Sequence, residues 1–199
     1  MSRRKYELRQ RAETQAQTRG RIVKAALALH GTVGPARTNI SEIARLAGVE
    51  RRTIYNHFQH DHELFQACGE LWVEDRPPPD PAGWHAIDDP AARTRAALTA
   101  IYSYYQRNAD ELEPVLRDSL FIAPLRDVLE HGWLGYLASV GEDLVRASRR
   151  RGQARVRVAA VIALALDLGS WRRLTTDGCL TGDAAAALMS QLVHAAGGL

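Results

Sequence analysis

The chain has 199 residues, with 46% hydrophobic and 25% charged residues, which is enough apolar material for one large or two small folded domains. The longest apolar run, residues 158–166, is well short of the ~20 residues that a membrane-spanning helix needs, and the N-terminal "MSRRKYELRQ" lacks the apolar core of a secretory signal. Two cysteines, Cys68 and Cys179, lie far apart without metal-like spacing, so we expect a protein of the reducing cytoplasm, with no membrane partner.

The charge is divided unevenly along the chain. Residues 1–60 hold twelve basic and four acidic residues, a net charge of +8, whereas the remainder carries −5. A basic head on an acidic body suggests that the head meets a polyanion. A solvated basic tail would give the same count.

Helical periodicity dominates the first part of the chain. Within residues 21–31 apolar side chains recur at the i, i+3, i+4, i+7 spacing of one helix face, namely at Ile22, Ala25, Ala26 and Leu29. A second helix begins after Asn39, which forms a capping-box pattern with Glu42, and Gly48 then permits a tight turn. Basic residues within 3–11 precede the first helix, and they form either an arm that tracks DNA or a disordered tail.

The third helix, in "AGVERRTIYNHF", has a narrow apolar stripe and a wide polar face. Ile54 and Phe58 fit a core, while the residues around them carry charged or hydrogen-bonding ends. Three short helices with a glycine turn between the second and third form a helix-turn-helix arrangement. We interpret the polar face as the part that enters a DNA major groove, with a solvated surface helix as the simpler alternative.

Along the whole chain we expect a small domain, a linker and a larger domain, all α-helical. The boundaries are 1–60 for the helix-turn-helix domain with its basic arm, 61–76 for a connecting helix, 77–90 for a proline-rich linker and 91–199 for a helical ligand-binding and dimerisation domain. Helices are predicted at residues 91–108, 110–120, 124–150, 155–176 and 183–196.

Residues 38–65, "TNISEIARLAGVERRTIYNHFQHDHELF", resemble the DNA-binding segment of the tetracycline-repressor (TetR) family, and residues 21–31 resemble its first helix. The late stretch "LGSWRRLTTDGCLTGDAAAALM" resembles the last two helices of that family less specifically. The resemblance implies an all-helical homodimer that binds double-stranded operator DNA and leaves it when a small molecule binds the C-terminal domain.

The resemblance also assigns roles to individual residues. Thr53 and Tyr55 match positions that bond backbone phosphates, Arg51 one that grips phosphate or a base, and Arg52 one that can read bases. The remaining expected DNA contacts are Asn56, His57, Asn39, Ser41 and His60.

Three positions depart from the family pattern. Asp61 replaces a frequent lysine and repels phosphate, a loss that His60 and His62 partly offset. Glu50 stands at a usual Ser or Thr cap, and His30 at a usual Phe.

The C-terminal domain is less informative. Aromatic residues with polar tips are expected to line a cavity for a mainly apolar effector, or else simply to pack a helical core: Tyr102, Tyr105, Phe121, Trp133 and Trp171. Asp167 interrupts an apolar helix and needs a partner, for which Arg172, Arg173 or a ligand group are candidates. The two Ala- and Leu-rich helices at 155–176 and 183–196 are expected to meet their symmetry mates in a dimer.

The function expected from the sequence is a ligand-responsive transcriptional regulator, a repressor released from a palindromic operator. The alternatives are an architectural DNA-binding protein without ligand control and an enzyme. Because the chain has no nucleophile elbow, P-loop, dinucleotide-binding glycine pattern or paired catalytic carboxylates at recognisable spacing, we expect no enzyme and no cofactor. The histidines of "HFQHDHE" lack the spacing of a zinc site, so no metal is expected.

Overall fold

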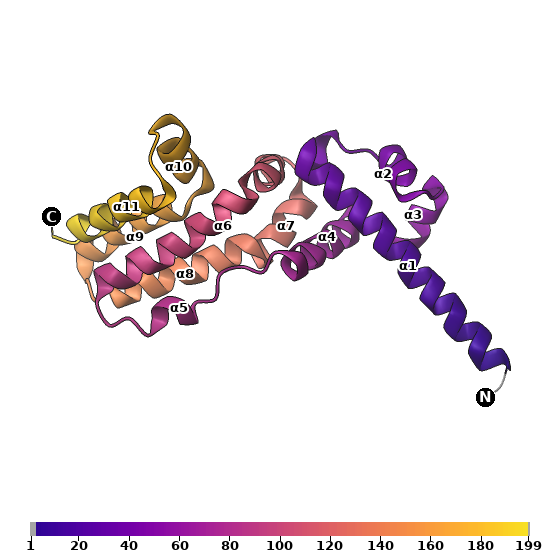
Figure 1. The fold of residues 1–199 in the computed structure, drawn as a ribbon, viewed down its shortest axis with the longest axis horizontal. Coiled ribbons are helices and arrows are strands. Elements are labelled where there is room, and N and C mark those ends of the chain that lie inside the picture. Colours follow the sequence, from indigo (N-terminus) through magenta and orange to yellow (C-terminus); the bar gives the residue numbers. More distant parts are fainter. Residues whose placement is uncertain (1–2, 199) are drawn as a thin grey trace. The chain divides into compact units, whose positions relative to one another are not determined.

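The computed structural model describes residues 3–198, apart from the side chains of residues 3–5 and 8, and the described residues form helices without a strand (Figure 1). The α-helices are α1 (Arg3–Thr32), α2 (Ile40–Ala47), α3 (Arg51–His57), α4 (Asp61–Asp75), α5 (Ala82–His85), α6 (Pro90–Ser119), α7 (Ala123–His131), α8 (Trp133–Ala147), α9 (Gly152–Leu166), α10 (Leu168–Arg172) and α11 (Gly182–Ala196). A short 3-10 turn, η1 (Pro35–Arg37), and a π-helical turn, η2 (Arg173–Asp177), complete the set. The all-α prediction is confirmed.

The helices form two compact units, Met1–Pro77 with Asp110–Leu129, and Pro78–Ala109 with Glu130–Leu199. This division differs from a simple N-terminal and C-terminal split, because residues 110–129 group with the first unit. Polar contacts account for the difference. The Glu111 carboxylate accepts from Arg76 at 3.1 Å, and the Asp127 carboxylate lies 2.8 Å from the His62 ring. The long helix α6 therefore runs through both units.

The residues expected to form an arm ahead of the first helix are part of it. Helix α1 begins at Arg3, and its first seventeen residues contain no glycine or proline but many strong helix formers. Arg9 and Glu13 form an i,i+4 ion pair at 2.9 Å on this exposed stretch. The prediction of an arm separate from the helix is wrong for the described backbone, and the side chains of residues 3–5 lie outside the described part.

The core of the first unit is the apolar face that the sequence pattern predicts. Side chains from α1 to α4 bury one another there: Ile22, Val23, Ala25, Ala26, Ile43, Ala44, Ala47, Ile54, Phe58, Leu64, Ala67 and Cys68. Burial in this core raises the pKa of the Cys68 thiol to about 12, so this cysteine is a small apolar residue and not a nucleophile.

A tight turn fixes the end of α6 within the first unit. Gly34 adopts φ 93°, and a Cβ there would lie 2.4 Å from Asp118 Oδ2. The same carboxylate accepts from the Ala36 amide at 2.9 Å and from Arg117 Nε at 2.8 Å. Burial alone would raise the pKa of Asp118, but these hydrogen bonds outweigh burial and lower it. Glycine is required at position 34 because only it combines this conformation with this approach.

The helices of the second half divide differently from the prediction. The two helices expected at 91–108 and 110–120 form one helix, α6, because Ala109 and Asp110 are not helix breakers, and this helix also contains Pro114. The helix expected at 124–150 is interrupted at Gly132, with φ −104° and ψ −111°, and becomes α7 and α8. The helix expected at 155–176 is interrupted at Asp167.

Asp167 finds a partner in the backbone of its own helix. It is exposed, and its carboxylate accepts from the Ser170 amide at 2.7 Å as the N-cap of α10. Aspartate is a favoured cap because its oxygen satisfies an amide that the helix leaves unpaired. The apolar helix therefore stops at Leu166 and a new one starts.

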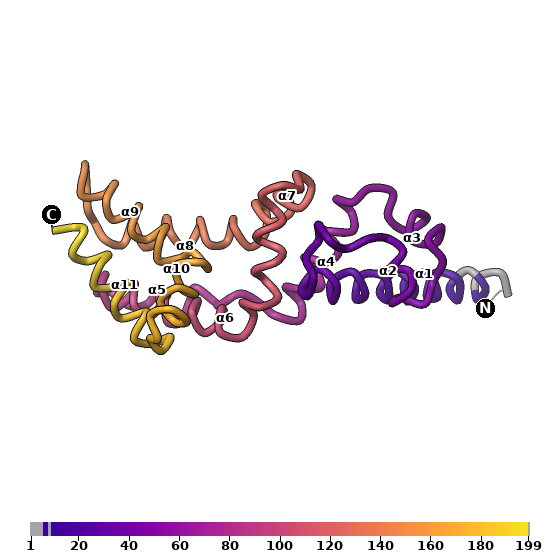
Figure 2. Tube along the Cα trace, turned by 90° about the horizontal axis from the view of Figure 1, so that it is seen from above, coloured from indigo at the N-terminus to yellow at the C-terminus, as the bar shows by residue number. Residues whose placement is uncertain are grey.

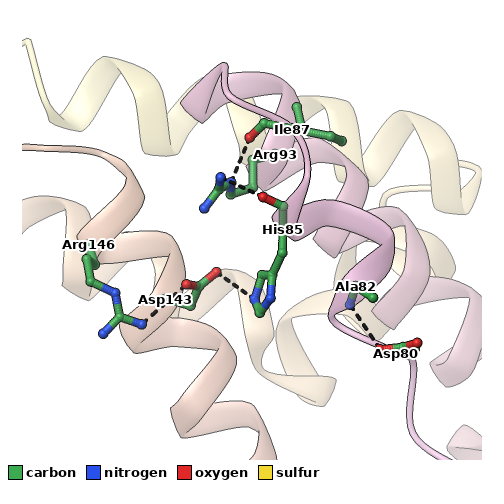
Figure 3. Close-up of polar contacts among 7 residues, drawn as sticks. All are labelled: Asp80, Ala82, His85, Ile87, Arg93, Asp143 and Arg146. Atoms are coloured by element: carbon green, nitrogen blue, oxygen red, sulfur yellow. Dashed lines mark hydrogen bonds and ion pairs between the residues drawn. The ribbon is translucent and has the colours of Figure 1, made fainter.

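The proline-rich segment 77–90 is packed in place in the second unit. It contains α5, whose Trp84 is 1% exposed. Figure 3 shows His85 Nε2 at 3.1 Å from Asp143 Oδ2 on α8, while Arg93 of α6 donates to the His85 and Ile87 carbonyls. These contacts hold the segment against two helices of its own unit.

The described helices include none with the length and apolar character required to cross a membrane.

The buried His30 gives the first unit an acid-sensitive stability. Its ring is 5% exposed and lies 5.4 Å from the Phe65 ring. Burial lowers the pKa of His30 from 6.5 to about 4, although the charge of Asp118 acts in the opposite direction. Between pH 6.5 and 4, the His30 ring therefore binds a proton in the unfolded chain but stays neutral in the folded chain.

We predict that His30 alone lowers the free energy of unfolding, relative to its value above pH ~6.5, by about 2 kcal/mol at pH 5 and about 3 kcal/mol at pH 4. Urea unfolding of wild type and His30→Phe at pH 7.5, 6, 5 and 4 measures this contribution as the difference between their pH profiles. Parallel profiles would show that His30 titrates alike in the folded and unfolded chains.

Candidate nucleic-acid interface and aromatic cluster

Helices α2 and α3 are joined by a turn whose ends are defined by local hydrogen bonds. Asn39 Oδ1 accepts from the Glu42 amide at 3.0 Å and Glu42 Oε2 accepts from the Asn39 amide at 3.4 Å, so the predicted capping box forms. At the other end of α2, Gly48 adopts the left-handed conformation, φ 63° and ψ 43°. This single residue redirects the chain into α3.

Helix α3 is held down by its apolar stripe. Ile54 is 1% exposed and Phe58, which follows the helix as its C-cap, is 4% exposed. The Arg19 guanidinium of α1 lies 4.7 Å from the centre of the Phe58 ring, which adds a cation–π contact to the apolar packing. One side of the short helix is thereby fixed against the core.

The other side of α3 is open. Arg51, Arg52, Tyr55 and Asn56 are exposed, with Tyr55 51% exposed, and Thr53 is half-buried. The exposed side of α3 thus carries two guanidinium groups, a phenol and an amide, and Ser41 of α2 is exposed as well. Guanidinium and amide groups read base edges, and hydroxyls bond phosphates, so this surface has the chemistry of a DNA contact.

Two of the expected contact residues, Asn39 and His57, lie close to carboxylate side chains. The side chain of Asn39 both accepts from and donates to Glu42, with Nδ2 donating to Oε2 at 2.9 Å, which occupies one of its two N–H donors. His57 lines a polar cleft of ≈ 250 Å³ with Arg19, Glu63 and Glu70 among its walls. A phosphate near His57 would face two carboxylates.

Acidic side chains lie at the start of α4. Asp61 and Glu63 lie in its first turn, and Glu63 Oε2 accepts from the Gln59 amide at 2.8 Å. His60 is exposed but caps nothing with its side chain, and His62 pairs with Asp127. Among the described residues no group of three or more His, Cys, Asp or Glu side chains is placed to hold a metal ion.

Sequence reasoning missed Arg21 of α1. This residue is exposed, and a Cβ on Gly48 would lie 3.7 Å from its guanidinium, which places Arg21 beside the turn between α2 and α3. Its position on the polar face of α1 is visible in the sequence, but only the packing of α1 on α2 brings it to the turn.

A cluster of aromatic rings occupies the second unit. Trp133 of α8 stacks on Tyr104 and on Tyr136, with ring centres 4.7 Å and 5.4 Å apart. Tyr105 joins this stack to Trp171, with its ring 5.9 Å from that of Trp133 and 5.6 Å from that of Trp171. Four of the five predicted ligand-lining residues are thus near one another, and Tyr104 and Tyr136 are members that the sequence analysis missed.

Phe121 does not belong to this cluster, contrary to the expectation from the sequence. It follows α6 in the first unit and is 82% exposed, so it lines no cavity with the other four. The sequence pattern shows that an aromatic residue is present but cannot show that the chain turns sharply between α6 and α7 at this point, which leaves the ring in solvent.

The hydroxyls of two cluster tyrosines have a structural task. Tyr102 donates to the Ala165 carbonyl at 2.9 Å and Tyr105 donates to the Leu166 carbonyl. These are the last carbonyls of α9, which the break at Asp167 leaves without helical partners. Burial, and then the nearby charge of Asp167, raises the pKa of both tyrosines, so they stay neutral donors.

Two indole groups of the cluster lack an acceptor. Trp133 Nε1 and Trp171 Nε1 are buried without a hydrogen-bond partner among the described residues, as is Trp84 Nε1 outside the cluster. A buried donor left without an acceptor costs free energy, so such groups are places where a ligand oxygen is bound favourably.

Comparison with known proteins identifies the first unit. Residues 22–68 match the family model described as bacterial regulatory proteins, tetR family. The HTH-type transcriptional regulator TtgR of Pseudomonas putida is 43% identical over 60 residues, which cover 30% of this chain and 29% of that protein. The regulator AcrR of Shigella flexneri is 42% identical over 55 residues, covering 28% and 26%. The matched segment therefore spans under a third of these relatives.

Solved structures extend the likeness to the fold of the whole chain. A TetR-like transcriptional regulator from Rhodococcus sp. RHA1 is similar over 88% of this chain and 93% of its own, with a TM-score of 0.62 and 22% identity. At this identity the likeness concerns the fold alone.

The matched segment 22–68 contains the capping box, the turn glycine and the anchored helix α3 described above. Within this segment the chain is similar to the tetR family of bacterial regulatory proteins, and its fold is similar to that of a TetR-like regulator.

Proposed function

We propose that the protein is a homodimeric, ligand-responsive transcriptional regulator of the cytoplasm, a repressor that leaves a palindromic operator when a small molecule binds. The observation that carries the proposal is helix α3, which is anchored by the buried Ile54 and Phe58 and exposes Arg51, Arg52 and Tyr55. The match of residues 22–68 to the tetR family of bacterial regulatory proteins supports the regulatory role.

In the proposed complex the two α3 helices of a dimer enter successive major grooves, about 34–36 Å apart, of one duplex. Arg52 reads bases, because its planar fork matches the paired acceptors of guanine. Tyr55 and Thr53 bond backbone phosphates and set the register. Arg21, beside the turn, adds a phosphate contact from α1.

The dimer surface that we propose lies on α9 and α11, which pack side by side in the second unit (Figure 1). Each helix exposes apolar side chains at i, i+4 spacing on the face away from the core. Val156 and Leu164 are 60% and 54% exposed on α9, and Leu188 and Leu192 are 38% and 46% exposed on α11. The small, exposed Ala160 between them permits close approach of a second copy.

The aromatic cluster of the second unit is the proposed effector site. Its stacked rings suit a mainly apolar, flat molecule, and the unpartnered N–H groups of Trp133 and Trp171 suit an oxygen acceptor on that molecule. We therefore expect an aromatic effector with a carbonyl, phenolate or carboxylate oxygen.

We propose that helix α6 links effector binding in the second unit to DNA binding by the first. It carries Tyr102 and Tyr105 of the cluster in the second unit, and its last turn holds Asp118, which accepts from Ala36 just ahead of α2. An effector changes DNA binding only if its affinity differs between the two states of the protein.

An architectural DNA-binding protein remains the alternative function. It would bind DNA with little sequence preference and without control by small molecules. Selection of bound duplexes from a random pool separates the two functions.

The first prediction concerns base reading. Duplexes selected by the protein from a random pool should share a palindrome, and Arg52→Ala should relax the preference at particular base pairs, with a loss of about 1–3 kcal/mol on the selected duplex. Tyr55→Ala should weaken binding to all sequences alike. Fluorescence anisotropy with selected and scrambled duplexes measures both, with Arg95→Ala in the second unit as control. A selection without any shared motif would favour the architectural alternative.

The second prediction concerns assembly. Wild type should be a dimer at micromolar concentration, and Leu164→Glu with Leu192→Glu should give monomers, because four buried carboxylates at a symmetric interface cannot be solvated. Light scattering measures the mass. Val73→Glu, at a residue that is 50% exposed on α4, is the matched control and should remain dimeric. A wild-type monomer would exclude the proposed interface.

The third prediction concerns the effector. In a screen of small aromatic carboxylates and phenols, a compound that releases the selected duplex should act roughly 3–10-fold less potently on Trp171→Phe, which keeps an apolar ring but removes the N–H. The free energy of unfolding of Trp171→Phe should fall only by the packing that the smaller ring loses, since the N–H has no acceptor in the free protein. Trp84→Phe, which removes an equally unpartnered N–H outside the cluster, should respond as wild type. Equal potency on all three proteins would place the effector elsewhere.

A further inference from the structure

The second unit carries a concentrated basic surface that the proposed operator binding does not use. Six arginines and no acidic residue occur in residues 144–157, which include the end of α8, the turn and the start of α9. The other residues after position 60 hold eight basic and nineteen acidic side chains. The cluster therefore stands out against an acidic surrounding.

Two of the six arginines form polar contacts with other residues of the second unit. Arg157 Nε donates to the Ala196 carbonyl at the end of α11, at 3.1 Å. Arg146 lies 3.3 Å from Asp143, a carboxylate that His85 also contacts (Figure 3). A third, Arg150, lies against the C-terminal end of α11, since a Cβ on Gly197 would be 2.8 Å from its Nε.

Arg149, Arg151 and Arg155 are exposed, and no contact accounts for them within the described structure. Arg149 adopts φ 55°, a conformation that favours glycine, at the point where the chain reverses between α8 and α9 (Figure 2). Arg151 and Arg155 are one helical turn apart and lie at the N-terminal end of α9.

This placement is electrostatically unfavourable for the protein alone. The N-terminus of α9 has no acidic residue in its first turn and no side-chain cap, and its N-cap residue is Arg151 itself. Positive side chains at the positive end of a helix repel the helix dipole, whereas a bound anion would relieve both repulsions. The surface is therefore adapted to an anionic partner.

We propose that the surface formed by Arg149, Arg151 and Arg155, with Arg146 and Arg150 at its edge, binds the phosphate backbone of duplex DNA. Guanidinium groups spaced by about one helical turn, 5.4 Å, suit a repeating row of phosphates, each of which accepts two hydrogen bonds from one guanidinium. Residues 146–155 contain no aromatic or large aliphatic side chain of the kind that inserts into a lipid surface. Contact here is independent of sequence, and it gives the protein a second DNA-binding surface besides α3.

The test uses the full chain with Arg51→Glu and Arg52→Glu, which remove the contribution of α3. Anisotropy with a fluorescein-labelled 30-base-pair duplex of random sequence is measured between 50 and 300 mM KCl. In this background the triple variant Arg149→Ala, Arg151→Ala, Arg155→Ala should lose at least about ten-fold in affinity, and the slope of log affinity against log salt should fall by about two to three.

The matched control is Arg95→Ala, Arg107→Ala, Arg173→Ala, which removes the same charge from exposed arginines elsewhere in the second unit and should leave affinity and slope within about two-fold. The corresponding triple lysine variant of the proposed surface should retain most of the slope. Circular dichroism checks that each variant is folded.

Three outcomes would overturn the proposal. The proposed surface could be removed without effect on duplex binding, the control triple could lower binding as much, or the protein could bind phosphatidylglycerol vesicles through these arginines while ignoring the duplex. Because α3 is disabled throughout, none of these outcomes bears on the proposed operator binding, which the selected duplex tests in the unaltered background.

Discussion

The burial of Ile54 and Phe58 is the interaction on which the proposed DNA-binding surface depends. Each buried side chain of this size stabilises its position by about 1.5–3 kcal/mol relative to exposure. A seven-residue helix is too short to persist by its own hydrogen bonds, so these two contacts decide both that α3 forms and which way it faces. Once that stripe is fixed, the polar flank with Arg51, Arg52 and Tyr55 must face solvent.

The same logic of anchoring explains the second unit. The break at Asp167 divides one apolar run into α9 and α10, and the two carbonyls that it exposes are satisfied by Tyr102 and Tyr105 of α6. Aromatic residues that suggest only a ligand cavity in the sequence therefore also hold a helix end. A ligand that moves these rings acts on the capped end of α9 and on α6 together, and α6 continues to Asp118 in the first unit.

The predictable features are those encoded by neighbours in the chain. The capping box of Asn39 and Glu42, the turn at Gly48 and the apolar stripe of α3 rest on contacts within a few residues, and all three form as predicted. The engagement of His57 in an acidic cleft and the exposure of Phe121 depend on distant elements, and no local pattern signals them. Asp167 was expected to pair with Arg172, Arg173 or a ligand group, whereas its carboxylate accepts from the Ser170 backbone amide as a helix cap.

Protection of α3 by DNA tests the central claim most directly. A cysteine introduced by Asn56→Cys on the exposed flank, in a Cys179→Ser background that leaves only the buried Cys68, reports access to the flank through its alkylation rate. Saturating duplex selected by the protein should slow alkylation at least about ten-fold, because a side chain inside a groove is reached only when the complex opens. The same reaction at Glu74→Cys, exposed on α4, should keep its rate. Unchanged alkylation at position 56 on a protein that is demonstrably bound to DNA would contradict the account.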